Sequence, residues 1–344
     1  MDVPDRLLDV PLDPLLDWAR AGLAAAGFRD AGAAPVVRRR EWSTVVRLDT
    51  DRGPVWVKAN ARDWRYEAAL QVRLARWAPD VVLAPVLVDE ARGWLVTPHG
   101  GDLLRSVPAG ADWWAALLQG YAGLQRRAAG HVAELRALGL PDMTPATLPR
   151  WYAAVLERAD AEPDARRLLP AEDRRELERL APVVRELAGE LAGDGLPVTV
   201  EHIDLHPGNV LSGPGGLRVF DWADAALAHP FLCLGGALDV AAGDGSDGDG
   251  SDGDGSDGDG SDGAAAAAAD RLRQAYLRCW TPDPTAPVPD RLRRSAAVAE
   301  CLFPVVTAAS WLRLPLPLRP DFAVQWAGHL QRFRVTARLV AAGR

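Results

Sequence analysis

Residues 201–225 read EHIDLHPGNVLSGPGGLRVFDWADA, and the centre of this stretch predicts a β-hairpin. The runs NVLS (209–212) and LRVFD (217–221) are rich in residues typical of strands. The linker GPGG (213–216) is a strong turn signal. The stretch therefore predicts two short antiparallel strands, with the segment HIDLHPG forming the loop that enters the first of them.

The register of this hairpin brings two polar side chains together. If Ser212 and Leu217 close the turn, Asn209 lies opposite Phe220 and beside Asp221. One amide and one carboxylate then meet at the same end of the hairpin. Oxygen ligands of this kind suit Mg²⁺, which keeps some of its waters and shares substrate phosphates instead of filling a cage of protein ligands.

A third oxygen-bearing side chain lies on the loop before the hairpin. Asp204 precedes Asn209 by five residues. A carboxylate held close to a metal-bound phosphate can accept the proton of an attacking hydroxyl group. The three side chains together would suit a site that binds Mg²⁺ and a phosphate group.

The rare residues of the chain favour the same region. Lys58 is the only lysine, and the other 38 basic residues are arginine. Asn60 and Asn209 are the only asparagines, and three of the six histidines fall within 202–229. An ammonium group is a compact point charge, whereas a guanidinium group is a wide planar fork. Lys58 is therefore either a chance occurrence in an arginine-rich chain or a residue kept for its chemistry.

The first 97 residues predict a small antiparallel sheet with helices. A helix is expected over 5–27, and the turn DRG joins two strands that form a hairpin ending near Lys58. A helix with one apolar face follows, and two more strands flank the turn at 91–93. The expected ranges are 43–50 and 54–59 for the hairpin, 62–77 for the helix, and 84–90 and 93–98 for the later strands.

The rest of the chain predicts a mainly helical region. Helical patterns begin at residue 112, and a single strand is expected within 196–200, directly before the stretch quoted above. Pro182 predicts a kink in one of the helices. The other helices are expected over 147–160, 170–192, 264–280, 288–312 and 320–342. We expect an α+β protein with an N-terminal unit over 1–97 and a larger C-terminal unit over 98–344.

The motifs of the quoted stretch resemble a known family. HIDLHPGN is similar to the H-x-D-x-x-x-x-N catalytic loop, and FDWADA to the metal-binding D-W-x-D/E-A motif, of the aminoglycoside phosphotransferase and choline kinase family, which is related to protein kinases. The resemblance is dense over 201–230 and extends to 43–101. It implies a bilobal, protein-kinase-like fold that binds ATP and Mg²⁺ between its lobes.

The resemblance also implies roles for individual residues. Asp204 would be the catalytic base, and Asn209 and Asp221 would bind Mg²⁺. Lys58 would contact the α- and β-phosphates, oriented by Glu67 on the following helix. The segment TPHGG, with Thr97 and His99, would form the hinge that touches adenine.

Two histidines of the same loop are further candidates for the catalytic machinery. His202 is expected to orient the loop by hydrogen bonds. His206 follows Asp204 by two residues, where many protein kinases carry a lysine that contacts the transferred phosphate. We consider a role in phosphate contact and a packing role for His206 equally open.

The sequence departs from the family pattern at several positions. RREWSTVVRL, before the first strand pair, lacks a G-x-G-x-x-G, so a phosphate cradle there would use the backbone and hydroxyls of Ser43 and Thr44. Ile203 stands where the family usually has Gly. Cys233 replaces the second Asp of the later D-P-x-x-D-L-A pattern, and Pro98 removes one donor from the hinge.

An acidic repeat accounts for the net charge of the chain. Residues 243–263 read GDGSDGDGSDGDGSDGDGSDG and hold eight aspartates, so the formal charge of −8 leaves the remainder neutral. A segment without apolar residues predicts a flexible, disordered insert. An EF-hand is excluded because Asp occupies the sixth position, where that loop needs Gly. The neutral remainder gives no indication of a nucleic acid or membrane partner.

Three further observations bear on the setting of the protein. Asp2 and Asp5 lie where a secretory signal would carry basic residues, and no apolar run reaches the roughly 18 residues of a membrane span. The three cysteines are widely spaced, which argues against a disulfide framework or a zinc site. We expect a cytoplasmic protein, and its oligomeric state stays open.

The sequence thus predicts an enzyme that transfers the γ-phosphate of ATP to a hydroxyl group of a small molecule. The main alternative is a catalytically inactive nucleotide-binding module. The absence of a Gly-rich phosphate loop is the reason to consider it. A protein kinase is less favoured, because DWA stands in place of D-F-G and no A-P-E follows.

Overall fold

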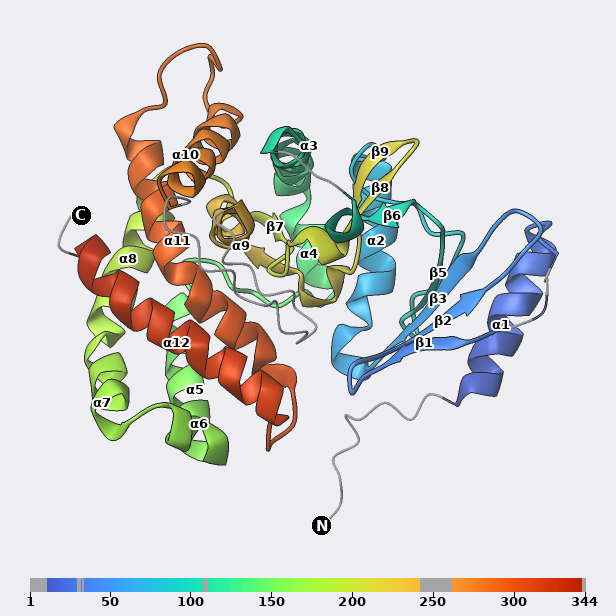
Figure 1. Ribbon diagram of the computed structural model, residues 1–344, viewed down its shortest axis with the longest axis horizontal. Helices are drawn as coiled ribbons and strands as arrows, with labels where there is room; N and C mark the ends of the chain where they lie inside the picture. The colour runs from blue at the N-terminus through green and yellow to red at the C-terminus, as the bar shows by residue number, and fades with distance from the viewer. Residues whose placement is uncertain (1–10, 30–31, 33, 108–110, 242–261, 342–344) are drawn as a thin grey trace.

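The computed structural model describes residues 11–29, 32, 34–107, 111–241 and 262–341. The chain forms two lobes, a smaller one built on an antiparallel sheet and a larger one that is mainly helical (Figure 1). The acidic repeat lies outside the described residues except for its last two, which begin a helix.

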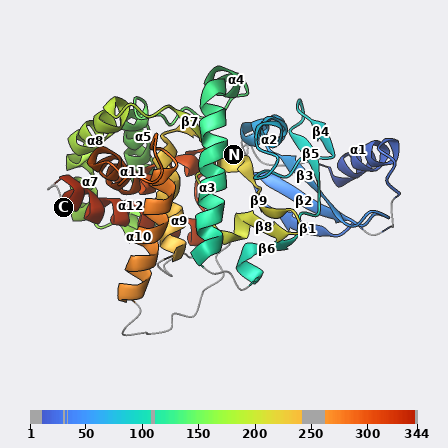
Figure 2. The same ribbon diagram turned by 90° about the horizontal axis from the view of Figure 1, so that it is seen from above.

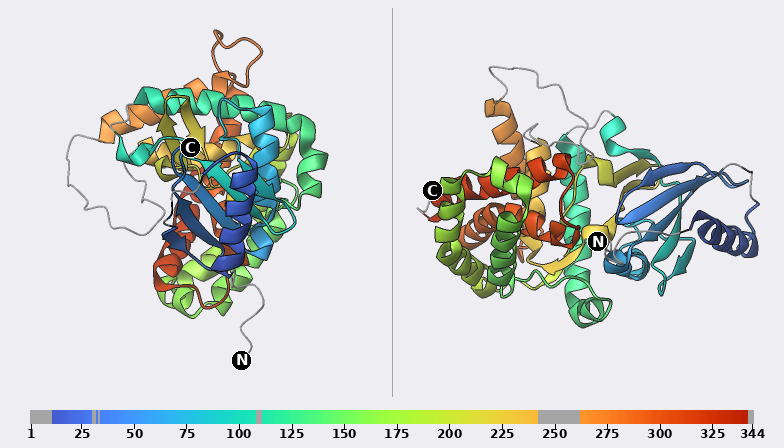
Figure 3. Two further views of the ribbon diagram at one scale, coloured as in Figure 1. Left: turned by 90° about the vertical axis from the view of Figure 1, so that its right-hand side faces the viewer. Right: turned by 90° about the horizontal axis from the view of Figure 1, so that it is seen from below.

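The smaller lobe is a five-stranded antiparallel sheet with one helix on each side. The strand order is β1-β2-β3-β5-β4, with every neighbouring pair antiparallel. Helix α1 lies on the side of the sheet that faces away from the helical lobe, as Figures 2 and 3 show. The elements are α1 (Leu12–Ala25), β1 (Val36–Arg39), β2 (Ser43–Leu48), β3 (Val55–Asn60), α2 (Tyr66–Trp77), β4 (Leu87–Asp89) and β5 (Trp94–Pro98).

The larger lobe contains two small sheets and many helices, which pack around them. One sheet has the order β6-β8-β9, and the other pairs β7 with β10. Its strands are β6 (Asp102–Leu103), β7 (Thr199–Glu201), β8 (Val210–Gly213), β9 (Gly216–Val219) and β10 (Ala226–Ala228). Its helices are α3 (Ala111–Ala128), α4 (Val132–Ala137), α5 (Leu148–Ala161), α6 (Pro163–Leu168), α7 (Ala171–Arg179), α8 (Ala181–Gly193), α9 (Cys233–Ala241), α10 (Asp262–Arg278), α11 (Asp290–Ser310) and α12 (Pro320–Ala341).

The structure corrects two expectations about local elements. β1 was not expected, because four exposed residues on an edge strand lack the alternation that marks a half-buried strand. Pro182 does not kink a continuous helix; the chain ends α7 at Arg179 and starts α8 at Ala181. The proline then lies in the first turn of α8, where its missing N–H group breaks no helical hydrogen bond.

The apolar core is divided unequally between the lobes. Side chains of α1 and the outer face of the sheet, such as Leu15 and Val57, form one cluster. The apolar residues of α2, including Leu70 and Leu74, belong instead to the large cluster of the helical lobe. Helix α2 is therefore packed as part of the helical lobe, although it lies between two strands of the smaller one in the sequence.

One segment is more apolar than we expected from the sequence. The stretch Asp290–Arg313, which contains α11, is long and apolar enough to cross a membrane, with a hydropathy of 1.5 over its best window. Within the structure 72% of that window is buried, and α11 packs against α5, α8, α9 and α12. The apolar character of α11 is thus used in the core of the helical lobe.

Candidate active site

The β8–β9 hairpin has the predicted register. Ser212 pairs with Leu217, and the pairing continues regularly to Val210 and Val219. The backbone N–H of Phe220 donates to the carbonyl of Asn209 at 3.0 Å. Asn209 and Asp221 therefore meet at one end of the hairpin, as we expected from the turn.

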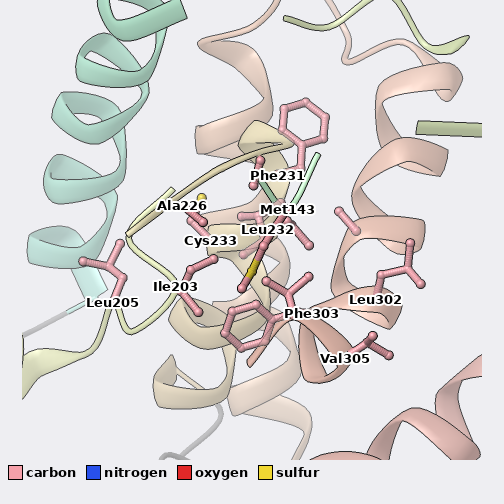
Figure 4. Close-up of a cluster of buried hydrophobic side chains, with 14 of the residues drawn as sticks. Met143, Ile203, Leu205, Ala226, Phe231, Leu232, Cys233, Leu302, Phe303 and Val305 are labelled. Carbon is pink, nitrogen blue, oxygen red and sulfur yellow. The ribbon is translucent and has the colours of Figure 1, made fainter. Parts of the chain in front are cut away.

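The loop before the hairpin turns one side chain outwards between two buried ones. Ile203 and Leu205 are both 3% exposed, and Figure 4 shows them packed in an apolar cluster with Phe303. The side chain of Asp204, between them, is 51% exposed. Burial of its two neighbours therefore fixes the direction in which Asp204 projects.

Ile203 adopts a backbone conformation that β-branched residues rarely accept. Its φ angle is +68°, in the left-handed region. Such a residue costs of the order of 1–3 kcal/mol and persists only where the surrounding structure determines it. The packed side chain of Ile203 thus stabilises the bend that glycine would give without strain.

Asp204 is held as an ionised carboxylate. The amide nitrogen of Asn209 donates to both the carbonyl oxygen and Oδ2 of Asp204, each at 2.9 Å. Nε2 of His206 lies 3.6 Å from the same Oδ2. Desolvation alone would raise the pKa of Asp204, but His206 and Asn209 outweigh it and lower the pKa. The group is therefore ready to accept a proton at neutral pH.

The two histidines of the loop have different surroundings. Nδ1 of His206 accepts a hydrogen bond from the N–H of Gly208 at 3.1 Å, so its Nε2 is the nitrogen that faces Asp204. His202 is fully buried, and its Nε2 lies 2.9 Å from the carbonyl of Phe220. Burial lowers the pKa of His202 and keeps it neutral. It is placed to tie the loop to the segment before Asp221.

Lys58 lies between two carboxylates from different parts of the chain. Its ammonium nitrogen is 2.7 Å from Oε2 of Glu67 on α2 and 2.7 Å from Oδ1 of Asp221. Burial would lower the pKa of Lys58, but the charges and hydrogen bonds of Asp221 and Glu67 outweigh it and raise the pKa. Asn60 also donates to Oε2 of Glu67, at 2.8 Å. The lysine is therefore a fixed, permanently charged group.

Asp221 joins this ammonium group to the hairpin. It has a left-handed conformation, with φ +60°, directly after β9. Burial would raise its pKa, but Lys58 lowers it, and the charge of Asp204 opposes that effect. Because the two carboxylates influence each other, the proton acceptor and the lysine contact belong to one site.

Two oxygen atoms of the site fit a hard cation. The amide hydrogens of Asn209 are used by Asp204, and its Oδ1 accepts no hydrogen bond from the described residues. Asp221 contacts Lys58 through Oδ1, so Oδ2 is available. No group of three or more His, Cys, Asp or Glu side chains within the described ranges forms a ligand set. The donors therefore suit a metal that completes its shell with substrate phosphates and water.

The structure corrects the expected phosphate cradle. Ser43 pairs with Asn60 and lies on the sheet face of Lys58. Thr44 is the next residue and points to the opposite face, where it is fully buried towards the α1 side. The hydroxyl of Thr44 cannot reach a phosphate beside Lys58, because successive side chains of a strand alternate between faces.

Arg38 is a candidate that the sequence did not reveal. It pairs with Val45 on β2, and Val45 pairs with Lys58 on β3, so the three side chains share one face. Its charge lowers the pKa of Asp221. The side chain is exposed and makes no ion pair or side-chain hydrogen bond with the described part of the chain. Arg38 could be placed near the site only once β1 was known to be a strand of this sheet, and the sequence pattern did not predict β1.

The expected hinge lies at the end of β5. Thr97 pairs with Trp56 and shares the face of Lys58. The backbone N–H of His99 donates to the carbonyl of Pro54 at 3.1 Å, and its side chain is exposed. The amide of His99 is therefore already engaged within the protein.

A second contact between the lobes borders the site. Arg313 donates to Asp224 at 2.5 Å and to the hydroxyl of Tyr66 at 2.9 Å. Trp42, in the turn between β1 and β2, lies 5.6 Å from the ring of Phe322 on α12. Arg313 has no sequence signal among so many arginines, and only the fold reveals this contact.

Comparison with known proteins places this geometry in a known fold. A choline/ethanolamine kinase family protein from Mesorhizobium loti is 18% identical and has a TM-score of 0.55, with 94% of this chain and 99% of that chain covered. A choline kinase from Cryptosporidium parvum is 8% identical, with a TM-score of 0.62 and coverage of 96% and 97%. Amicoumacin kinase, in a complex with AMP-PNP and Ca²⁺, is 12% identical, with a TM-score of 0.57 and coverage of 96% of each chain.

These matches confirm the predicted fold class, an antiparallel sheet joined to a helical lobe as in kinase-like phosphotransferases. The sequence itself matches no protein-family model and no curated protein. The shared feature is therefore the fold.

Proposed function

We propose that this protein is an ATP- and Mg²⁺-dependent phosphotransferase that transfers the γ-phosphate to a hydroxyl group of a small molecule. The observation that supports this most strongly is the contact of Lys58 with both Glu67 and Asp221, each at 2.7 Å. A fixed cation beside a free pair of oxygen ligands is what phosphate binding with a divalent metal requires.

Lys58 has the central role in binding the nucleotide under this proposal. Glu67 orients the ammonium group, which contacts the phosphates of ATP, and Ser43 lies on the same face of the sheet. The end of β5, with Thr97 and the segment around His99, would lie along the adenine. Asn209 and Asp221 would hold Mg²⁺, which neutralises negative charge on the phosphates when it is bound.

Asp204 would act as the catalytic base. It accepts the proton of the substrate hydroxyl while the substrate oxygen bonds to phosphorus and the bond to the departing ADP oxygen breaks. Asn209 and His206 hold its carboxylate, and His202 anchors the loop from behind. Most of the rate enhancement in such reactions comes from positioning and charge neutralisation, so a few fixed groups suffice.

The structural neighbours support this reaction class. The two kinases and the kinase–AMP-PNP–Ca²⁺ complex share the fold over nearly the whole chain. A nucleotide with a divalent cation in one of them agrees with the donor set of Asn209 and Asp221. A cytoplasmic location, where ATP and Mg²⁺ are abundant, and the absence of nucleic acid and membrane partners are parts of the same proposal.

A direct assay tests the proposal. The purified full-length chain is incubated with Mg-ATP and a panel of hydroxylated metabolites and antibiotics, and ADP release and labelled products are measured. We expect phosphorylation of one compound class by the wild type. Nucleotide binding without turnover on any compound would favour the inactive module, and labelled protein would favour a protein kinase.

Arg38 gives a prediction that is specific to this chain. We expect Arg38→Ala to raise the KM for ATP about tenfold, because one charge-assisted contact of about 1.4 kcal/mol to a phosphate is lost. Arg39→Ala is the matched control, since Arg39 pairs with Thr44 and lies on the opposite face. Steady-state kinetics with varied ATP measure both variants, and equal KM values for the two would contradict the assignment.

A further inference from the structure

A buried carboxylate lies directly behind the catalytic loop. Glu201 ends β7 and is fully buried. Its Oε1 accepts hydrogen bonds from the hydroxyl of Tyr121 and from the backbone N–H of His202, both at 2.9 Å. Its Oε2 accepts from the amide nitrogen of Gln125 at 3.0 Å.

The partners of Glu201 are themselves fixed by other elements. Tyr276 on α10 donates to Oε1 of Gln125 at 2.5 Å and to the carbonyl of Pro230 at 2.6 Å. Thr199 on β7 donates to the backbone carbonyl of Gln125 at 2.6 Å. Side chains from α3, α10 and β7 thus form one buried network in which the carboxylate is surrounded by donors. Such a network specifies a single arrangement because every member has a partner.

The network meets the catalytic loop at its strained bend. The backbone amide of His202, which donates to Glu201, lies directly before the residue whose φ is +68°. Holding the His202 amide fixes the backbone at the start of the bend, and the bend directs Asp204 outwards. At the start of α9, position 233 is a cysteine whose thiol donates to the carbonyl of Pro230.

We propose that Glu201 is the positioning residue that sets the catalytic loop, and that it supplies from the strand of the loop the carboxylate that α9 lacks at Cys233. This inference rests on the proposed function for its effect on catalysis, but the contacts of the loop can be measured without any substrate. Burial raises the pKa of Glu201 to about 8 in spite of its hydrogen bonds, so the carboxylate form that accepts at both oxygens prevails above that pH.

Glu201→Gln is the first test. A carboxylate accepts at both oxygens, whereas an amide must present an NH₂ group either to Gln125 or to the N–H of His202. We expect kcat to fall about 10- to 100-fold, because small displacements of catalytic groups have effects of this size. The KM for ATP should stay within about twofold, since Lys58 and Asp221 do not contact the network.

A rescue experiment separates positioning from general stability. In the Glu201→Gln background, Cys233→Asp restores a carboxylate next to the loop, and we expect it to recover at least about tenfold of the lost kcat. Cys233→Asp alone places two buried carboxyl groups side by side, so it should lower the melting temperature without raising kcat. Cys233→Ser in the Glu201→Gln background is the matched control and should recover nothing.

Amide hydrogen exchange tests the contacts independently of activity. In Glu201→Gln, peptides covering 202–204 should exchange at least about tenfold faster than in the wild type, in the absence of nucleotide. An inactive wild type with protected amides would reject the proposed function and leave this inference standing. Unchanged kcat and unchanged exchange in Glu201→Gln would overturn it.

A milder variant covers the case in which Glu201→Gln does not fold. Tyr121→Phe removes one donor to Glu201 and one acceptor of the His202 amide, and we expect about a fivefold fall in kcat with the KM for ATP unchanged. Tyr152→Phe removes a buried tyrosine hydroxyl bonded to the carbonyl of Leu177 and is the control. Equal kcat values for the two variants would also overturn the proposal.

Discussion

Asp204→Asn is expected to lower kcat by about 10²- to 10⁴-fold while the KM for ATP changes by no more than about twofold. Asparagine keeps the size of the side chain and one acceptor oxygen, so the contacts with Asn209 are retained. It cannot take up the proton of a substrate hydroxyl. The affinity for nucleotide rests on Lys58 and its partners, which this change does not touch.

The measurement combines turnover with nucleotide binding. Initial rates with the best compound of the acceptor panel give kcat, and calorimetric titration with ADP and Mg²⁺ gives the affinity. Asp270→Asn, on the surface of α10, removes an exposed carboxylate elsewhere and should leave both values unchanged. Full turnover in Asp204→Asn would show that Asp204 is not the base.

Lys58→Arg is expected to lower kcat/KM for ATP by about 10²- to 10³-fold, the range found when one preorganised donor to a developing charge is lost. The ammonium nitrogen contacts two carboxylates at 2.7 Å each, and its side chain is only 12% exposed. A guanidinium group is larger and planar, and it cannot take that position without displacing Glu67 or Asp221. The charge is kept in this variant, so the loss would report on geometry.

Lys58→Ala separates the structural part of this contact from the catalytic part. It leaves Glu67, which is 1% exposed, as an unpaired buried carboxylate, and we expect the free energy of unfolding to fall by about 3–5 kcal/mol. Adding Glu67→Gln should restore most of that stability and none of the activity. Urea unfolding followed by tryptophan fluorescence measures both effects.

The control for Lys58→Arg is the opposite exchange at an exposed site. Arg47 on β2 is paired with Asp49 at the surface, and Arg47→Lys should change neither stability nor kinetics appreciably. If Lys58→Arg retains wild-type kcat/KM, the isolated lysine has no special role at this position.

Short-range patterns account for the part of the site that the sequence predicted. The turn GPGG sets the register of β8 and β9, and that register alone brings Asn209 and Asp221 together. The single lysine stood out because every other basic residue is arginine. The first prediction depends on a turn of a few residues, and the second depends on the composition of the chain. Neither requires knowledge of long-range contacts.

Long-range contacts account for what the sequence could not predict. Tyr121 and Glu201 are 80 residues apart, and neither follows a pattern that distinguishes it from ordinary core and helix residues. Arg38 is on an edge strand that is exposed along its whole length. The face on which Thr44 lies follows from the pairing of β2 with β3, in which Thr44 is opposite Ala59 and not opposite Lys58. The sequence of the segment before β2 does not reveal this pairing. These assignments required the tertiary structure.

The left-handed isoleucine at position 203 has a consequence for how the protein responds to heat. A glycine at such a bend can rotate freely, whereas Ile203 is held there by the packing of its side chain against the helical lobe and by the bond of Glu201 to the preceding amide. If that packing loosens, the backbone relaxes to a β or right-handed conformation and turns Asp204 away. Activity and core packing should therefore be lost over the same temperature range. We expect no active intermediate in which the core is loosened and Asp204 keeps its position.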